Sequence, residues 1–287
     1  MTAALKQRPR ADEAASVAAK LNFVPAAFTQ ASYEIGPDGK RPYEPATIAV
    51  PIHDEGPRRA ELSLDREGYV LVPFVSATTD YKDSDQLFNI WSREVAALLK
   101  QMTGADHVIT FAQTTRHSAA DPTARNAGMT APAKYVHSDW GPNQFAPDVT
   151  HAVVKAEIEK LLQGRRPRKV RPYNVWQAIS PPPFDTPLAL CDARTVSPQD
   201  YCLTYFDASP DPETPCKIEV PAYKYSPAQR WVYFPDMQNE LLIFSGLDMD
   251  AGPNWRMVPH TAFDNPACPA GSAPRENAEL RAVAVFE

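Results

Sequence analysis

The sequence predicts a mainly β protein, a double-sheet jelly roll flanked by helices, and three observations support this prediction. Strand-like runs dominate after about residue 105, whereas helical periodicity is confined to the first 165 residues. The runs are short and are separated by segments rich in Pro, Asp and Ser, which interrupt strands. The chain holds 30 Pro but only 11 Gly, with 44% hydrophobic residues, which indicates ordered loops over a packed core.

We expect three helices, at 11–21, 85–103 and 149–162. The second is the best defined, because its apolar residues share one face: Leu87, Ile90, Trp91, Val95, Leu98 and Met102. Asp83 and Gln86 have the spacing of a capping box, and Gly104 and Gly164 stand where left-handed residues end helices. We expect strands at 68–75, 107–114, 173–179, 187–191, 230–234, 240–244, 256–260 and 278–286.

The chain shows no internal repeat and no linker. Its 287 residues are enough for one large β-rich domain that buries a substantial core. We therefore expect a single domain overall, with the jelly-roll core and its helical buttress at 62–287 and an N-terminal extension, 1–61, that packs on it.

Charge and composition exclude several partners. A net charge of -6 and a pI of about 5.6 argue against a nucleic-acid-binding surface. The basic run 165–171 is better explained as a solvated loop. Four cysteines without CxxC spacing indicate a reducing compartment, and no stretch approaches the ~18 apolar residues of a membrane span. We expect a cytoplasmic protein with no membrane or nucleic-acid partner, and a homodimer is compatible with the sequence.

The feature with the most chemical content is an H-x-D pair, His137 and Asp139, followed far downstream by His260. Side chains at i and i+2 of a strand point to the same face, so one imidazole and one carboxylate can reach one ion. Two histidines and a carboxylate on one side of a metal leave the opposite positions open, which is typical of non-haem Fe(II) sites.

The H-x-D pair alone is a weak signal. Six histidines and 35 acidic residues should produce about 0.7 H-x-[DE] matches by chance. A competitor exists at His53, Asp54 and Glu55, which we interpret as a surface turn between Pro51 and Gly56. Two other interpretations stay open: a cupin-like metalloenzyme that does not use 2-oxoglutarate, and a ligand-binding jelly roll without catalytic activity.

The C-terminal segment favours the iron site. Arg275, Asn277 and Arg281 have the same parity, so they point the same way on one strand. Two arginines on an inward face are costly without anionic partners, and the guanidinium group binds a carboxylate through two parallel hydrogen bonds. This R-x-N-x-x-x-R strand after the distal histidine resembles the 2-oxoglutarate clamp of nucleic-acid-dealkylating dioxygenases. The alternative is a surface strand whose arginines pair with Glu276 and Glu279.

Six segments in a fixed order carry a wider resemblance: 136–139 (VHSD), 173–179 (YNVWQAI), 187–194 (PLALCDAR), 229–237 (QRWVYFPDM), 259–263 (PHTAF) and 274–281 (PRENAELR). Together they resemble the CmcJ/NvfI-type oxidoreductases over roughly residues 62–286. That resemblance implies a double-stranded β-helix, a cupin-like jelly roll, that uses Fe(II) with 2-oxoglutarate and O2 as cosubstrates. Members often act in natural-product biosynthesis.

The resemblance assigns roles by motif. His137, Asp139 and His260 would be the metal ligands, with no catalytic residue beyond the metal centre. Arg275 and Arg281 would bind the carboxylates of 2-oxoglutarate, and Asn277, Asn174 and Trp176 would lie beside them. Two positions depart from the family pattern: Gln177 replaces an arginine, which would alter an anion contact in or near the pocket, and Asn277 replaces a serine.

The substrate is expected to be a small, largely apolar molecule that is hydroxylated. Tyr135 is expected to line the metal cavity, and a group of bulky residues lies in segments that could form its mouth: Trp140, Phe145, Phe244, Met249 and Trp255. Desaturation, cyclisation and endoperoxide formation are the alternatives within the same chemistry.

Overall fold

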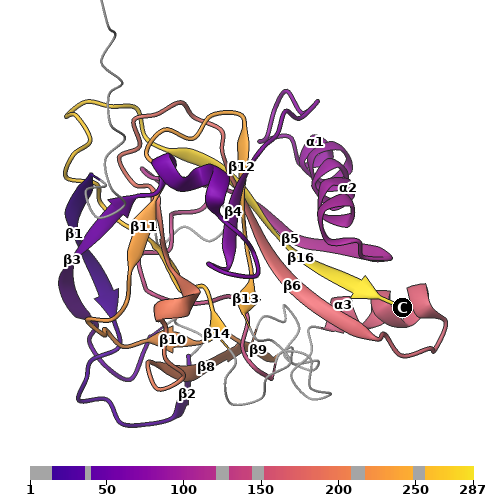
Figure 1. Cartoon of the computed structure of the whole chain (residues 1–287), viewed down its shortest axis with the longest axis horizontal. Helices are drawn as coiled ribbons and strands as arrows, with labels where there is room; N and C mark the ends of the chain where they lie inside the picture. The colour runs from indigo at the N-terminus through magenta and orange to yellow at the C-terminus, as the bar shows by residue number, and fades with distance from the viewer. Residues whose placement is uncertain (1–14, 36–39, 121–128, 144–151, 208–216, 248–255) are drawn as a thin grey trace, which may run out of the picture.

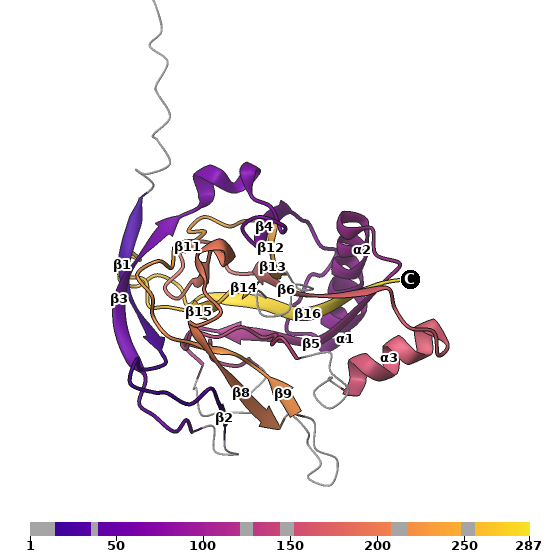
Figure 2. The ribbon, with the colours of Figure 1, turned by 60° about the horizontal axis from the view of Figure 1, so that its bottom comes forward.

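Two five-stranded β-sheets face each other in the computed structural model, which describes residues 15–35, 40–120, 129–143, 152–207, 217–247 and 256–287. Sheet I has the order β1–β3–β11–β7–β15, and sheet II has the order β4–β12–β6–β16–β5. This arrangement confirms the predicted jelly roll. Figure 1 shows β1 and β3 on one side of the molecule and the helices on the opposite side, and Figure 2 shows the same division.

The strands of sheet I are β1 (Ser16–Phe23), β3 (Ala46–Asp54), β7 (Leu188–Cys191), β11 (Trp231–Tyr233) and β15 (His260–Ala262). Those of sheet II are β4 (Tyr69–Pro73), β5 (His107–His117), β6 (Lys169–Ala178), β12 (Glu240–Phe244) and β16 (Glu276–Phe286). Smaller sheets are formed by β2 (Ser32–Glu34), β8 (Tyr201–Asp207), β9 (Lys217–Glu219) and β10 (Ala222–Tyr223), and by β13 (Gly246–Leu247) and β14 (Arg256–Met257). Seven of the eight strands expected from the sequence are present. The strand expected at 256–260 is divided, because residues 256–257 form β14 of a small sheet and β15 of sheet I begins only at His260.

The prediction of a helix at 11–21 is wrong over the part of the segment that the structure describes, because residues 16–23 form strand β1. Its buried residues alternate with exposed ones, since Ala19, Leu21 and Phe23 point inward while Lys20 points outward. Strand β1 pairs antiparallel with β3, which runs parallel to β11. The N-terminal segment therefore supplies two of the five strands of sheet I.

The predicted long helix is confirmed but is interrupted. It consists of α1 (Ser84–Gln86), a π-helical turn (Leu87–Trp91) and α2 (Ser92–Thr103), and Gly104 ends it with φ of 69°. Asp83 caps the N-terminus by accepting from the backbone N–H of Asp85, 2.9 Å away. The expected reciprocal capping box is not formed, because the Gln86 side-chain oxygen accepts instead from the backbone N–H of Thr79.

Helix α2 covers the outer face of sheet II, and Trp91, Val95 and Leu99 pack against buried residues of β6, β12 and β16. A second apolar cluster fills the space between the two sheets and includes Leu190 and Phe244. Helix α3 (Ala152–Leu162) was also predicted, and Gly164 follows it with φ of 83°. Short 3-10 turns lie at Gly56–Glu61 and Ala193–Thr195.

A β-bulge interrupts sheet II beside the space that holds the functional residues. Strand β16 pairs Glu279 with Thr114 but Arg281 with Phe111, so β5 carries one extra residue there. Ala112 has a positive φ of 52° at this point. Such bulges bend a strand and redirect its side chains, and this one places Ala112 and Gln113 on the wall of the largest cavity described below. Among the residues described, no helix is long and apolar enough to cross a membrane.

Candidate active site

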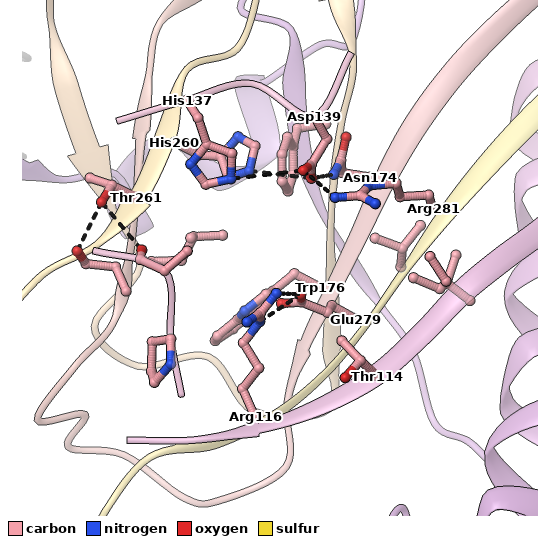
Figure 3. Close-up of a pocket in the computed structure, with 18 of the residues that line it drawn as sticks. Thr114, Arg116, His137, Asp139, Asn174, Trp176, His260, Thr261, Glu279 and Arg281 are labelled. Atoms are coloured by element: carbon pink, nitrogen blue, oxygen red, sulfur yellow. Dashed lines mark hydrogen bonds and ion pairs between the residues drawn. The ribbon is translucent and has the colours of Figure 1, made fainter. Parts of the chain in front are cut away.

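The three predicted metal ligands meet at the edge of sheet I. His137 and His260 form an antiparallel pair whose backbones exchange two hydrogen bonds, of 3.2 Å and 2.8 Å. Side chains of directly opposed residues lie on the same face, and the two imidazole rings are 4.5 Å apart between centroids. Asp139 follows His137 by two residues and lies against both rings, as Figure 3 shows. The ligand atoms of the three residues all lie within 4.8 Å of one another.

Backbone carbonyl groups orient both imidazoles. The Nδ1 of His137 lies 2.6 Å from the carbonyl oxygen of Tyr135, and the Nδ1 of His260 lies 3.2 Å from that of Val258. A carbonyl only accepts, so each Nδ1 donates and each Nε2 is left with a lone pair for a metal. The Nε2 atoms of His137 and His260 lie 3.7 Å and 3.5 Å from the carboxylate oxygens of Asp139. Burial and the nearby His260 lower the pKa of His137 to about 4, so its ring is neutral at physiological pH.

Asp139 is held by two residues of sheet II. Asn174 on β6 donates through Nδ2 to one carboxylate oxygen, and Arg281 on β16 donates to the other. Burial raises the pKa of Asp139, but the charge of Arg281 and the contact with His260 outweigh it and hold that pKa well below its ordinary value. The Nε1 of Trp140 donates to the Asn174 side-chain oxygen over 2.8 Å, which fixes the orientation of the amide. The protein itself thus keeps this carboxylate ionised and oriented.

A cavity of about 380 Å³ extends from the three ligands into the space between the sheets. Polar side chains on its wall come from β5, β6, β15 and β16 and their neighbouring loops: Gln113, Thr114, Arg116, Asn174, Thr261, Arg275, Glu279 and Arg281. Trp176, Leu188 and Phe244 are among its apolar members. The Phe244 ring lies 4.8 Å from the His260 ring between centroids, so one ligand is shielded by an aromatic side chain.

Arg275 places a buried guanidinium group on this wall. The residue is only 2% exposed, its Nε donates to the carbonyl oxygen of Thr186 over 2.7 Å, and its Cζ lies 5.5 Å from the centre of the Trp176 ring. The Nη1 atom is buried and has no hydrogen-bond partner among the residues described. Burial lowers the pKa of Arg275 to about 10, so the group stays charged at neutral pH. A buried cation with an unused donor is suited to a carboxylate ligand.

These features fit an Fe(II) ion with a dicarboxylate beside it. Two neutral imidazoles and one carboxylate on one side form the donor set of a non-haem iron site. Carbonyl acceptors behind each imidazole and hydrogen bonds behind the carboxylate are the outer contacts that orient metal ligands. The unpartnered Nη1 of Arg275 lies on the wall of the same cavity and can receive the far carboxylate of 2-oxoglutarate.

The other predicted residues are placed in different ways. Trp176 lines the cavity, but Asn277 and Trp140 are buried and do not. Asn277 donates to Glu279 over 3.3 Å, while Trp140 acts through Asn174 as described. Tyr135 lines a second, smaller cavity that His137 and Asp139 also line. Phe145, Met249 and Trp255 lie outside the described residues.

Gln177 corrects the expectation of a changed anion contact. It lies on the opposite face of β6 from Trp176, where its side-chain oxygen accepts from the Trp91 Nε1 over 2.6 Å. Strand alternation explains this placement, because residues 174 and 176 point to the cavity while 177 points to the π-helical turn that precedes α2. Gln177 therefore stabilises the packing of the helix and does not touch the cavity.

Arg116 and Glu279 were not predicted as cavity residues. Arg116 on β5 binds Glu279 on β16 through Nε and Nη2, at 2.7 Å and 2.6 Å, and through Nη1 it donates to the carbonyl oxygen of Ala131 over 2.9 Å. Figure 3 shows this pair across the cavity from Asp139. Glu279 shares the parity of Arg275 and Arg281, which was the available signal. Arg116 lies beyond the predicted end of its strand at residue 114, so the sequence carried no signal that it lines the cavity.

The competing motif at His53 is part of a structural ion-pair network and not a surface turn. His53 and Asp54 end strand β3, and the fully buried Glu55 binds Arg230 through two contacts, of 3.2 Å and 2.7 Å. Tyr69 also donates to Glu55 over 3.2 Å. Because Glu55 is already paired with Arg230, the carboxylate of this H-x-E match is not free to bind a metal.

Comparison with known proteins agrees with this geometry. A family model described as "Oxidoreductase/YMDC permease-like domain" matches residues 20–286. The Fe(II)/2-oxoglutarate-dependent dioxygenase nvfI of Aspergillus novofumigatus is 30% identical over 242 residues, which cover 81% of each chain. The hydroxylase/desaturase asaB of Aspergillus flavus is 36% identical over 124 residues, which cover 40% of this chain and 54% of that protein.

Solved structures give the same result. The iron and alpha-ketoglutarate-dependent endoperoxidase NvfI superposes with a TM-score of 0.76 and 25% identity, over 94% of this chain and 98% of that chain. A single-residue variant of that endoperoxidase superposes with a TM-score of 0.75 and 26% identity, over 95% and 97%. The likeness therefore spans both sheets and the cavity between them.

Proposed function

The chain belongs to the CmcJ/NvfI-type family of Fe(II)/2-oxoglutarate-dependent oxidoreductases, and from that membership we propose that it hydroxylates a small organic molecule in natural-product biosynthesis. It is a non-haem iron dioxygenase, with Fe(II) as its metal and with 2-oxoglutarate and O2 as cosubstrates. The observation that carries the proposal is the triad of His137, Asp139 and His260 on a cavity that also holds the Arg275 guanidinium group, whose Nη1 has no hydrogen-bond partner among the described residues.

In this proposal the three triad residues hold Fe(II). Arg275 binds the far carboxylate of 2-oxoglutarate, and Trp176 packs beside the Arg275 guanidinium group. Arg281 has a different task, because its guanidinium group is already paired with Asp139. We therefore infer that Arg281 and Asn174 orient a metal ligand. When bound, iron and 2-oxoglutarate together supply the activation of dioxygen for oxidation of a C–H bond.

The chain's own residues provide orientation and exclusion of water. Hydrogen bonds behind His137, Asp139 and His260 fix the donor atoms, and Phe244 covers the His260 ring. The Arg116–Glu279 pair neutralises two charges on the cavity wall without drawing on Arg275. Desaturation, cyclisation and endoperoxide formation remain alternatives, because the named relatives include a hydroxylase/desaturase and an endoperoxidase. We further propose that the enzyme is cytoplasmic and acts on a free small molecule and not on nucleic acid.

The test is anaerobic titration with Fe(II) and then with 2-oxoglutarate. We expect the visible charge-transfer band of the iron chelate in the wild type. His260→Ala should abolish the band, whereas Arg275→Gln should retain iron and raise the 2-oxoglutarate concentration needed for half-saturation by at least about tenfold. Arg93→Gln is the matched control, because Arg93 is exposed on helix α2. A fully iron-loaded wild type without the band would refute the proposed function.

A further inference from the structure

A second cavity, of about 190 Å³, reaches two residues of the metal triad, His137 and Asp139, and does not include Arg275. Both cavities include Ala133, His137, Asp139 and Arg281. The rest of the smaller one is formed by Tyr135, by the N-terminal arm (residues 1–61) and by the small β8–β10 sheet. Its apolar wall is formed by Ile35, Phe206, Val220 and Ala222. A molecule bound there would lie beside the metal without occupying the Arg275 pocket.

The charges on this second cavity do not balance. Asp139 is the single acidic residue among the described residues that line it, and it is already paired with Arg281. Arg41 adds a further cation. No carboxylate within the described part of the chain pairs with Arg41, and its Nε is buried without a hydrogen-bond partner. Arg41 is half-buried, and a guanidinium group that is partly removed from water is stabilised by an anionic partner.

The Arg41 guanidinium group is held in a defined position. Its Cζ lies 3.8 Å from the centre of the Tyr135 ring. This stacking attracts the cation to the ring face and leaves the N–H groups at the guanidinium edge free for another partner. Tyr135 is tied to the metal site as well, since its carbonyl oxygen accepts from the Nδ1 of His137. The cation is therefore placed relative to the iron ligands by a single intervening residue.

Aromatic contacts surround the Arg41 segment and hold it in place. The Tyr43 hydroxyl lies 2.5 Å from that of Tyr33 and also contacts that of Tyr135. Phe28 packs on Tyr43 and Tyr33, with ring centroids 4.6 Å and 5.5 Å apart. Burial raises the pKa of Tyr135, so its hydroxyl stays protonated at neutral pH. A cation that is positioned in advance loses little entropy when an anionic group binds.

We propose that this second cavity is the substrate subsite and that Arg41 binds a carboxylate of an otherwise apolar substrate. The inference rests on the proposed function, because it takes the triad as the iron site. It assigns to the substrate an acidic group at the Arg41 end and an apolar body along Ile35, Phe206 and Val220. The carboxylate would hold the apolar body in a fixed orientation toward the metal.

The test uses 4-phenylbutyrate and its primary amide as matched probes, which differ in charge and share the apolar part. The protein is loaded with Mn(II) and saturating 2-oxoglutarate, and each probe is titrated by calorimetry. Paramagnetic broadening of the probe's proton signals reports its distance from the metal. We expect the acid to bind at least about tenfold more tightly than the amide, with broadened signals. Arg41→Gln should remove this preference, Arg41→Lys should restore part of it, and Arg93→Gln should leave it intact.

The outcomes separate this inference from the proposed function. The Fe(II)–2-oxoglutarate band is recorded for the wild type and for Arg41→Gln, and its presence in both shows that the variant is folded and holds the cosubstrate. Absence of the band in the wild type would refute the proposed function. Where the band forms, the subsite is refuted if the acid fails to bind, if its preference survives Arg41→Gln, or if it binds by displacing 2-oxoglutarate.

Discussion

Arg281 binds the carboxylate of Asp139 across 142 residues of sequence, and this contact joins strand β16 of sheet II to the proposed metal ligands beside sheet I. This contact gives Arg281 a role different from that of Arg275, although both side chains point to the same face near the C-terminus. Each keeps one buried N–H group without a hydrogen-bond partner among the described residues, but Arg281 is also paired with a carboxylate, that of the proposed metal ligand Asp139. The two residues should therefore fail in different ways when they are replaced.

Replacing Arg281 should weaken metal binding first. In Arg281→Met, Asp139 loses its charged partner while Asn174 remains, so the carboxylate is less well oriented. Removal of an outer contact to a metal ligand typically costs about 10- to 100-fold in metal affinity. We expect a loss in this range by Fe(II) titration under anaerobic conditions. Once the variant is saturated with iron, its affinity for 2-oxoglutarate should lie within about threefold of the wild type. Unchanged iron affinity with lost 2-oxoglutarate binding would assign the cosubstrate to Arg281.

Glu279 should make the stability of the protein depend on acid pH. Burial raises the pKa of Glu279, but the charge and hydrogen bonds of Arg116 outweigh it, and the net shift is downward from 4.5. A carboxylate whose pKa is lower in the folded state stabilises the fold above its unfolded pKa. That contribution is lost as the pH falls below 4.5 and through the folded value.

The measurement is urea unfolding of the wild type and of Glu279→Gln between about pH 6 and pH 3. The wild type should lose free energy of unfolding more steeply than the variant below about pH 4.5. Arg116→Gln should flatten the profile in the same way, because it removes the cause of the shift. Parallel profiles for all three proteins would show that the pair does not contribute to acid sensitivity.

Much of the fold followed from strand periodicity, but the N-terminal arm did not. The alanine-rich run before Phe23 suggested a helix, although Ala19, Leu21 and Phe23 alternate with outward residues. Pairing with β3 overrides the weak helix propensity of this run. The helix prediction took account only of the local sequence. The π-helical turn at 87–91 was likewise invisible, because its effect on the helix face is a local shift of one residue.

The site was predictable where its residues form local motifs. His137 and Asp139 stand two apart on one face, and Arg275 and Arg281 share the parity of one strand. Arg116 could not be found in this way, because its meaning comes from Glu279, 163 residues away. Arg41 could not be found from a local motif either, because its contact with Tyr135 depends on where the N-terminal arm packs on the rest of the jelly roll. Strand parity also places Glu279 on the cavity face of β16 and Gln177 on the opposite face of β6. Applied strictly, it predicts Glu279 as a cavity residue and excludes Gln177 from the cavity wall.

Removal of the N-terminal arm should prevent folding, because we propose that residues 1–61 and 62–287 form one folding unit. Strands β1 and β3 bury Leu21, Phe23 and Ile52 at 1% exposure or less, and β3 pairs with β11 of the core. A 62–287 fragment would expose these contacts and the edge of β11. We expect no cooperative unfolding transition and no iron binding for the fragment. A chain that lacks only residues 1–14 keeps both strands and serves as the control. Cooperative unfolding of the 62–287 fragment would contradict the single unit.

Gly141 should be essential for the position of the loop that carries Asp139, because it leaves room for the side chain of Glu219. It follows Asp139 by two residues, and a Cβ atom at this position would lie 1.7 Å from the Glu219 Oε1 and 2.4 Å from its Cγ. Glu219 is fully buried and accepts from the backbone and side-chain N–H groups of Asn143, at 3.1 Å and 3.0 Å, so it is held in place. Gly141→Ala must therefore displace the loop or the carboxylate.

We expect Gly141→Ala to lower the free energy of unfolding by ~1–3 kcal/mol, the usual cost of an overpacked buried site. Iron affinity should fall as well, because the displaced loop carries Asp139. The double variant Gly141→Ala/Glu219→Ala removes the carboxylate that the new methyl group meets. Its iron affinity should recover relative to Gly141→Ala, although the Asn143 contacts are lost. If the double variant binds iron no better than Gly141→Ala alone, the close approach of Glu219 is not what requires glycine at position 141.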